Sequence, residues 1–197
     1  GKINASQIDT YVEGHVNDES FEHMVQPKMV YLSHPTELGT LYTRKEIEEI
    51  AQICKKWDLY LYLDGARLGY GLGVVESDVT LPLLAELCDV FYIGGTKVGA
   101  LFGEAVVITN PQLMKDFRYI MKQNGGMLAK GRLLGLQFQC LFEDDLYLQM
   151  GRHGIQMADL LRKGLEESGL TFLIDSPTNQ IFPILEDVMI EKLKEDF

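Results

Sequence analysis

Three short polar stretches each follow an apolar run that is typical of a buried strand. They are the loop at residues 34–40, Asp64-Gly65-Ala66-Arg67, and Gly94-Gly95-Thr96-Lys97. In open α/β sheets, ligands bind beyond the carboxyl ends of the strands. Right-handed crossovers bring the three stretches to the same edge of such a sheet. The sequence therefore predicts a single site at this edge.

Asp64 ends a run of leucine and tyrosine residues at positions 59–63. A carboxylate in such an apolar setting needs a cationic partner or several hydrogen-bond donors. A cap of the following loop, or an ion pair with Arg67, is the simplest structural role for it. Gly65 and Ala66 add little bulk, so a flat ligand can approach the backbone at this point.

Lys97 follows two glycines and a threonine directly after an expected strand. An isolated lysine is normally a surface residue. Here the flanking glycines remove side-chain cover and the strand supplies apolar walls, so we expect a partly desolvated amine that can attack a carbonyl. A lysine and an aspartate at adjacent strand ends form the pair that pyridoxal phosphate chemistry requires. The lysine forms the Schiff base, and the carboxylate keeps the pyridine nitrogen protonated.

The order of these motifs resembles the threonine aldolase / aromatic amino acid β-eliminating lyase family. The resemblance rests on Leu63-Asp64-Gly65-Ala66-Arg67, Cys88-Asp89-Val90-Phe91, Gly95-Thr96-Lys97-Val98-Gly99, Gly125-Gly126-Met127 and Lys130-Gly131-Arg132. It extends from about residue 28 to at least residue 135, and more weakly to the C-terminus. It implies an aspartate-aminotransferase-like enzyme of fold type I that depends on pyridoxal 5'-phosphate.

The resemblance also implies roles for four residues. Lys97 would be the Schiff-base lysine, and Asp64 would pair with the ring nitrogen. Arg67 would lie beside the cofactor and help to hold the substrate carboxylate, for which a guanidinium is well shaped. Thr96 would contact the cofactor through its hydroxyl.

By the same resemblance, the intact enzyme cleaves a β-hydroxy-α-amino acid, of the L-threonine or allo-threonine type, to glycine and an aldehyde. Its partner is a small amino-acid substrate, and a homo-oligomer (dimer or tetramer) is expected because sites in this family are shared between subunits. Two alternatives remain open. One is another pyridoxal-phosphate lyase that works by β-elimination, since the aspartate and the lysine are common to both reactions. The other is a catalytically incompetent piece.

Both ends of the chain look cut. It opens on Gly1 without an initiator methionine and closes at Phe197 within an expected helix. The family's phosphate loop and ring-stacking histidine precede residues 28–33, and its C-terminal arginine would follow Phe197. We therefore expect a fragment with little or no activity of its own. His34 could act as an acid or base, but a histidine between a strand and a proline more often has a structural role.

Composition narrows the class of protein. Among 197 residues, 18 Lys and Arg against 29 Asp and Glu give a net charge of −11, which disfavours nucleic acid and anionic membranes as partners. No apolar run approaches the ~18 residues of a membrane span. Three scattered cysteines favour a reducing, cytoplasmic setting over a disulfide framework. The histidines lack metal-ligand spacing, so no metal is expected.

The alternation of apolar runs and helical patterns predicts an α/β fold with a mainly parallel sheet covered on both faces. Residues 1–149 are expected to form part of the large cofactor-binding domain, and residues 150–197 part of a small α+β domain. A capping box at Thr43 and Glu46 begins one helix, and residues 69–73 are expected to form a flexible turn. Strands are expected at 28–33, 59–63, 90–93, 105–109, 171–174 and 181–185, and helices at 6–13 (with Ser6 as cap), 43–57, 81–87, 111 onward with breaks at 124–126 and 151–154, and after 187.

Overall fold

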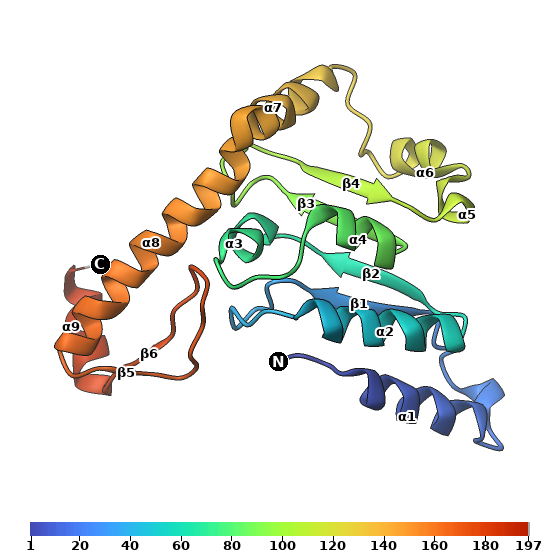
Figure 1. Cartoon of the computed structure of the whole chain (residues 1–197), viewed down its shortest axis with the longest axis horizontal. Helices are drawn as coiled ribbons and strands as arrows, with labels where there is room; N and C mark the ends of the chain where they lie inside the picture. The colour runs from blue at the N-terminus through green and yellow to red at the C-terminus, as the bar shows by residue number, and fades with distance from the viewer. Residues whose placement is uncertain (197) are drawn as a thin grey trace.

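A four-stranded sheet lies at the centre of the computed structural model, which describes residues 1–196 (Figure 1). Its strands are β1 (Met29–Ser33), β2 (Tyr60–Asp64), β3 (Val90–Gly94) and β4 (Glu104–Ile108), in the order β1-β2-β3-β4. The first three strands are parallel and β4 is antiparallel to β3. Ser33 pairs with Asp64, so the carboxyl ends of β1 and β2 are level. The expected mainly parallel sheet is confirmed.

Helices α2 (Arg44–Lys56) and α4 (Leu81–Leu87) cover one face of the sheet and lie in front of the strands in Figure 1. Helix α2 begins at the predicted capping box, in which Thr43 and Glu46 each bond the other's backbone N–H. Alternate strand residues bury themselves under these helices, and the core consists mainly of Val30, Leu32, Leu61, Leu63, Phe91, Ile93, Ile47, Ile50 and Leu84.

The opposite face of the sheet is left uncovered by residues 1–196. Met29, Tyr31 and Val106 on that face are all at least half exposed. The prediction of cover on both faces is therefore wrong for residues 1–196. The reason is topological, because the strand order runs in one direction from β1 to β3 and successive right-handed crossovers then place their helices on the same face.

Two glycine-rich stretches form helices where turns or breaks are expected. Residues 69–73 lie within α3 (Leu68–Gly73), and α8 (Leu146–Glu167) runs without a break through residues 151–154. A Cβ on Gly151 would lie 2.1 Å from the carbonyl oxygen of Gly69, and one on Gly154 would lie 2.6 Å from the Tyr70 ring. These glycines therefore allow α8 to cross close to α3. The packing of the two helices outweighs the low helix propensity of glycine at these positions.

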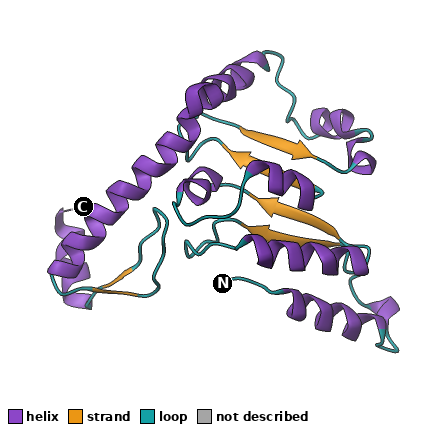
Figure 2. Ribbon diagram, in the orientation of Figure 1, coloured by secondary structure: helices purple, strands orange, loops and turns teal. Residues whose placement is uncertain are grey.

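The remaining helices and strands, coloured by type in Figure 2, follow the predicted order, and their ends are shifted from the predicted bounds. The first helix is capped by Asn4 and not by Ser6, because the Asn4 side chain accepts the Gln7 N–H. The expected break at 124–126 is present, whereas the two late strands are shorter than expected. These elements are α1 (Ala5–Val16), η1 (Phe21–His23), α5 (Pro111–Met114), α6 (Phe117–Gln123), α7 (Arg132–Phe142), η2 (Glu143–Asp145), β5 (Thr171–Phe172), β6 (Pro183–Ile184) and α9 (Asp187–Asp196). None of the helices within residues 1–196 combines the length and the apolar character needed to span a membrane.

Candidate active site

Asp64 lies at the carboxyl end of β2, where three donors hold its carboxylate. Oδ1 accepts the Tyr92 hydroxyl at 2.5 Å and the Ala66 N–H at 2.9 Å, and Oδ2 accepts the Tyr31 hydroxyl. Burial by itself raises the pKa of Asp64, but these hydrogen bonds and the nearby Lys97 ammonium more than offset it. The pKa of Asp64 therefore lies below its usual value, and the group is a carboxylate at neutral pH.

Of the two structural roles expected for Asp64, the loop cap is present and the ion pair with Arg67 is not found among the described residues. Asp64 does cap its own loop, through the Ala66 N–H. It forms no ion pair with Arg67 within residues 1–196. Arg67 is half-buried at the N-cap of α3, where its carbonyl oxygen accepts the Tyr70 N–H at 3.0 Å. Within the described part of the chain, no carboxylate lies at ion-pair distance from the Arg67 guanidinium.

Lys97 lies in the tight turn that follows β3. The Gly95 carbonyl closes this turn by accepting the N–H groups of Val98 at 2.9 Å and Ala100 at 3.0 Å. The Tyr70 hydroxyl donates to the Lys97 carbonyl oxygen at 2.6 Å. Lys97 itself is exposed, so the expectation of a partly desolvated amine is wrong for this chain. The buried side chains of this turn belong to Val98 and Ala100.

Glu104 anchors the residues that precede Lys97, and sequence reasoning missed it. It opens β4 opposite Gly94, where its carboxylate accepts the Gly95 N–H at 2.5 Å and the Thr96 hydroxyl at 2.8 Å. Thr96 is exposed and, with its proton engaged by Glu104, it offers a ligand only its oxygen lone pairs. The sequence feature that could have indicated this role of Glu104 is an acidic residue at the start of an otherwise apolar strand.

Tyrosine rings form a row beside Asp64 on the uncovered face of the sheet. The rings of Tyr31 and Tyr62 stack with centroids 5.4 Å apart and an interplanar angle of 13°, and the Tyr62 and Tyr92 centroids are 6.4 Å apart. This row could have been predicted from the sequence, because residues two apart on a strand share a face and Tyr62 is therefore on the same face as Asp64. The Tyr62 and Tyr92 rings are tilted by 46°, so the row is not a single flat surface, and only its two outer members, Tyr31 and Tyr92, bond Asp64.

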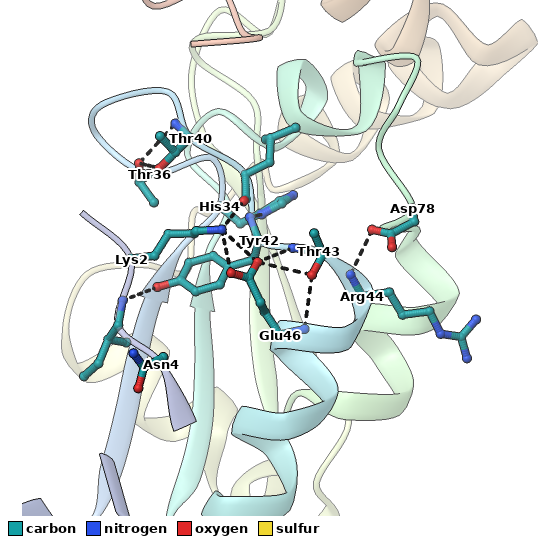
Figure 3. Close-up of polar contacts among 12 residues, drawn as sticks. Lys2, Asn4, His34, Thr36, Thr40, Tyr42, Thr43, Arg44, Glu46 and Asp78 are labelled. Carbon is teal, nitrogen blue, oxygen red and sulfur yellow. Dashed lines mark hydrogen bonds and ion pairs between the residues drawn. The ribbon is translucent and has the colours of Figure 1, made fainter. Parts of the chain in front are cut away.

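His34 has a structural position. It is fully buried, its Nδ1 accepts the Tyr42 N–H at 3.3 Å, and burial lowers its pKa to about 4. Figure 3 shows His34 beside Tyr42, with the ion pair between Lys2 and Glu46 next to them. A neutral, enclosed imidazole is not placed to exchange protons with a ligand, so the structural interpretation of His34 is the better one.

Glu37 is the titratable group that the same loop presents to the surface. Its carboxylate accepts the Ser33 hydroxyl at 2.6 Å, which lowers the pKa of Glu37, while the nearby Asp64 carboxylate opposes this shift. Gln180 donates to the Glu37 carbonyl oxygen at 2.6 Å, and the Ser176 hydroxyl donates to the Gly39 carbonyl at 3.1 Å. The C-terminal segment therefore fixes the loop that borders the site.

The donor set suits a heterocyclic ring that carries a protonated nitrogen and an aldehyde. Asp64 is an ionised carboxylate with no cation at ion-pair distance among the described residues, and Lys97 is an amine on the neighbouring strand end. The same part of the chain contains no group of three or more His, Cys, Asp and Glu side chains that could hold a metal ion.

The same fold is present in solved structures that contain pyridoxal 5'-phosphate. Cystalysin from Treponema denticola, whose structure contains pyridoxal 5'-phosphate, shares this fold over 99% of the present chain and 50% of its own, with a TM-score of 0.65 and 14% identity. The profile of the beta-eliminating lyase family matches residues 1–187. The chain belongs to this family.

Two proteins with higher sequence identity to this chain are named as threonine aldolases. A threonine aldolase structure from Leishmania major is 47% identical, with a TM-score of 0.93, and the match covers 100% of this chain and 56% of that one. A low specificity L-threonine aldolase from Pseudomonas aeruginosa is 33% identical over 174 residues, which are 87% of this chain and 50% of that protein. The chain thus spans about half the length of the curated relatives it matches.

Proposed function

We propose that this chain supplies part of the active site of a pyridoxal-phosphate-dependent lyase that cleaves β-hydroxy-α-amino acids of the L-threonine or allo-threonine type to glycine and an aldehyde. The observation that carries the proposal is the placement of an ionised Asp64 and of Lys97 at the ends of neighbouring parallel strands. The similarity to proteins named as threonine aldolases supports the substrate class.

The residues of this chain would divide the work by their chemistry. Asp64 would hold a proton on the ring nitrogen, and the Lys97 amine would bind the aldehyde carbon. Arg67 would pair with the substrate carboxylate, and Thr96 would accept a hydrogen bond from the ligand while Glu104 holds its proton. When bound, the cofactor supplies a conjugated ring that takes up the electron pair released at the substrate's α-carbon.

Cofactor binding is tested by adding pyridoxal phosphate to the chain and recording the visible absorbance of the lysine-bound form. We expect this absorbance in the wild type and in Lys115→Ala, which removes another exposed lysine, and we expect its loss in Lys97→Ala. An unchanged spectrum in Lys97→Ala would remove Lys97 from the site.

The reaction is tested with the whole protein and L-threonine. Glycine and an aldehyde in equal amounts are expected, whereas ammonia and a keto acid without aldehyde would point to β-elimination and contradict the proposal. The 197-residue chain alone is expected to show little or no turnover.

We also infer how the chain is organised and where it acts. Residues 1–149 would belong to the large domain and residues 150–197 to the small one, with α8 crossing the boundary. Exposed apolar side chains on α6 and α7, among them Ile120 and Leu133, support a homo-oligomer, which sedimentation analysis of the whole protein would detect. Three free cysteines support a cytoplasmic location.

A further inference from the structure

We propose that Tyr92 and Tyr31 are positioning residues that divide the two oxygens of Asp64 between them. Tyr92 fixes Oδ1, and Tyr31 occupies Oδ2 until the N–H of a cationic ring displaces it. Oδ2 is then the oxygen that the site presents to its ligand. This inference deepens the proposed function and rests on it for the identity of the ring.

The two oxygens differ in how firmly they are held. Oδ1 has two donors, the Tyr92 hydroxyl at 2.5 Å and the Ala66 N–H at 2.9 Å. One of these is a backbone group that cannot leave without unfolding the loop. Oδ2 has one donor among residues 1–196, the hydroxyl of Tyr31. A carboxylate oxygen has two lone pairs, so Oδ1 is saturated and Oδ2 can take one more donor or exchange its present one.

The two tyrosines also differ in their freedom to move. Tyr92 lies on β3, an inner strand, and is half-buried. Tyr31 lies on β1, at the edge of the sheet, and is 52% exposed. The Tyr31 hydroxyl can therefore exchange Asp64 for water more readily than the hydroxyl of the less exposed Tyr92.

The charged surroundings favour a cation at Oδ2. Both tyrosine hydroxyls have raised pKa values through burial and the Asp64 charge, so they remain protonated donors. Two other charged groups lie near this carboxylate. Lys97 lowers the pKa of Asp64, and the Asp64 charge opposes the lowering of the Glu37 pKa by its hydrogen bond with Ser33. Asp64 therefore stays negative before a ligand arrives.

Tyr62 provides a matched control. It lies on the same face two residues before Asp64, and its ring stacks on Tyr31, but its hydroxyl bonds no partner among the described residues. Tyr62→Phe thus removes a phenol oxygen from the same aromatic row without removing a donor to Asp64.

The test is the affinity of the chain for pyridoxal phosphate in three Tyr→Phe variants. Tyr92→Phe should weaken binding about tenfold, the size expected for one hydrogen bond to a charged acceptor. Tyr31→Phe should tighten binding by up to about tenfold, because the ring no longer displaces a donor. Tyr62→Phe should leave the affinity unchanged. Changes of the same sign in Tyr31→Phe and Tyr92→Phe would overturn the division of the oxygens.

A second readout needs no cofactor. In the chain labelled with ¹³C at the aspartate carboxyl carbons, both Tyr31→Phe and Tyr92→Phe should raise the pKa of Asp64, and Tyr62→Phe should not. Equal titration curves in all variants would overturn the assignment. If the wild type binds no pyridoxal phosphate, the proposed function fails; if it binds but the variants do not move in opposite directions, only the tyrosine assignment fails.

Discussion

Tyr147 joins three elements through one buried hydroxyl. The side chain extends from α8, is 1% exposed, accepts the Gly69 N–H of α3 at 3.0 Å and donates to the Gly94 carbonyl of β3 at 2.9 Å. Gly94 precedes Lys97 by three residues, so this hydroxyl connects the long helix to the strand that carries the candidate lysine. We predict that Tyr147→Phe destabilises the fold.

The magnitude follows from what the substitution leaves behind. Phenylalanine keeps the ring and its stacking on Phe142, with centroids 5.3 Å apart. It leaves the N–H of Gly69 and the C=O of Gly94 without their hydroxyl partner, and both glycines are buried. At about 1–3 kcal/mol for each of the two unsatisfied buried groups, we expect the free energy of unfolding to fall by about 2–6 kcal/mol.

Urea unfolding followed by circular dichroism measures this loss. Tyr119→Phe is the control, because Tyr119 is 79% exposed and its substitution should change the free energy of unfolding by less than about 0.5 kcal/mol. A loss below about 1 kcal/mol in Tyr147→Phe would refute the claim that its hydroxyl is the partner that these two backbone groups need.

Three further predictions concern packing, pH and thiol reactivity. Gly151→Ala places a Cβ 2.1 Å from the Gly69 carbonyl oxygen and should cost more than about 3 kcal/mol in urea unfolding, whereas Gly135→Ala meets open space and should change stability by no more than about 1 kcal/mol. Burial lowers the pKa of His34 from 6.5 to about 4, so the unfolded chain binds more protons and stability falls as the pH drops from 6.5 towards 4. This loss should reach about 2 kcal/mol between pH 7.5 and 5 and should be absent in His34→Gln; equal slopes in the two proteins would contradict it. Cys140 is exposed and should react at once with a thiol reagent, while the two buried cysteines, whose pKa is raised to about 12, should react only on unfolding; fast modification of all three would contradict this burial.

Much of the fold could be predicted from the sequence because its signals are local. The capping box at Thr43 and Glu46 lies within one helical turn, and the apolar runs that become β1 to β4 need only their own residues to be recognised. The types and order of Asp64 and Lys97 likewise predicted where a site would lie and which chemistry it would suit. Their roles remain predictions for the whole protein.

The surroundings of those two residues were decided by the tertiary structure. Asp64 is held from a neighbouring strand on each side, by Tyr31 and Tyr92, and the turn before Lys97 is held by Glu104 from an antiparallel strand. Such partners depend on strand order and register, which arise only when segments distant in the sequence pair. For the same reason Gly151 looked like a helix break, although its missing side chain is what allows two helices to cross.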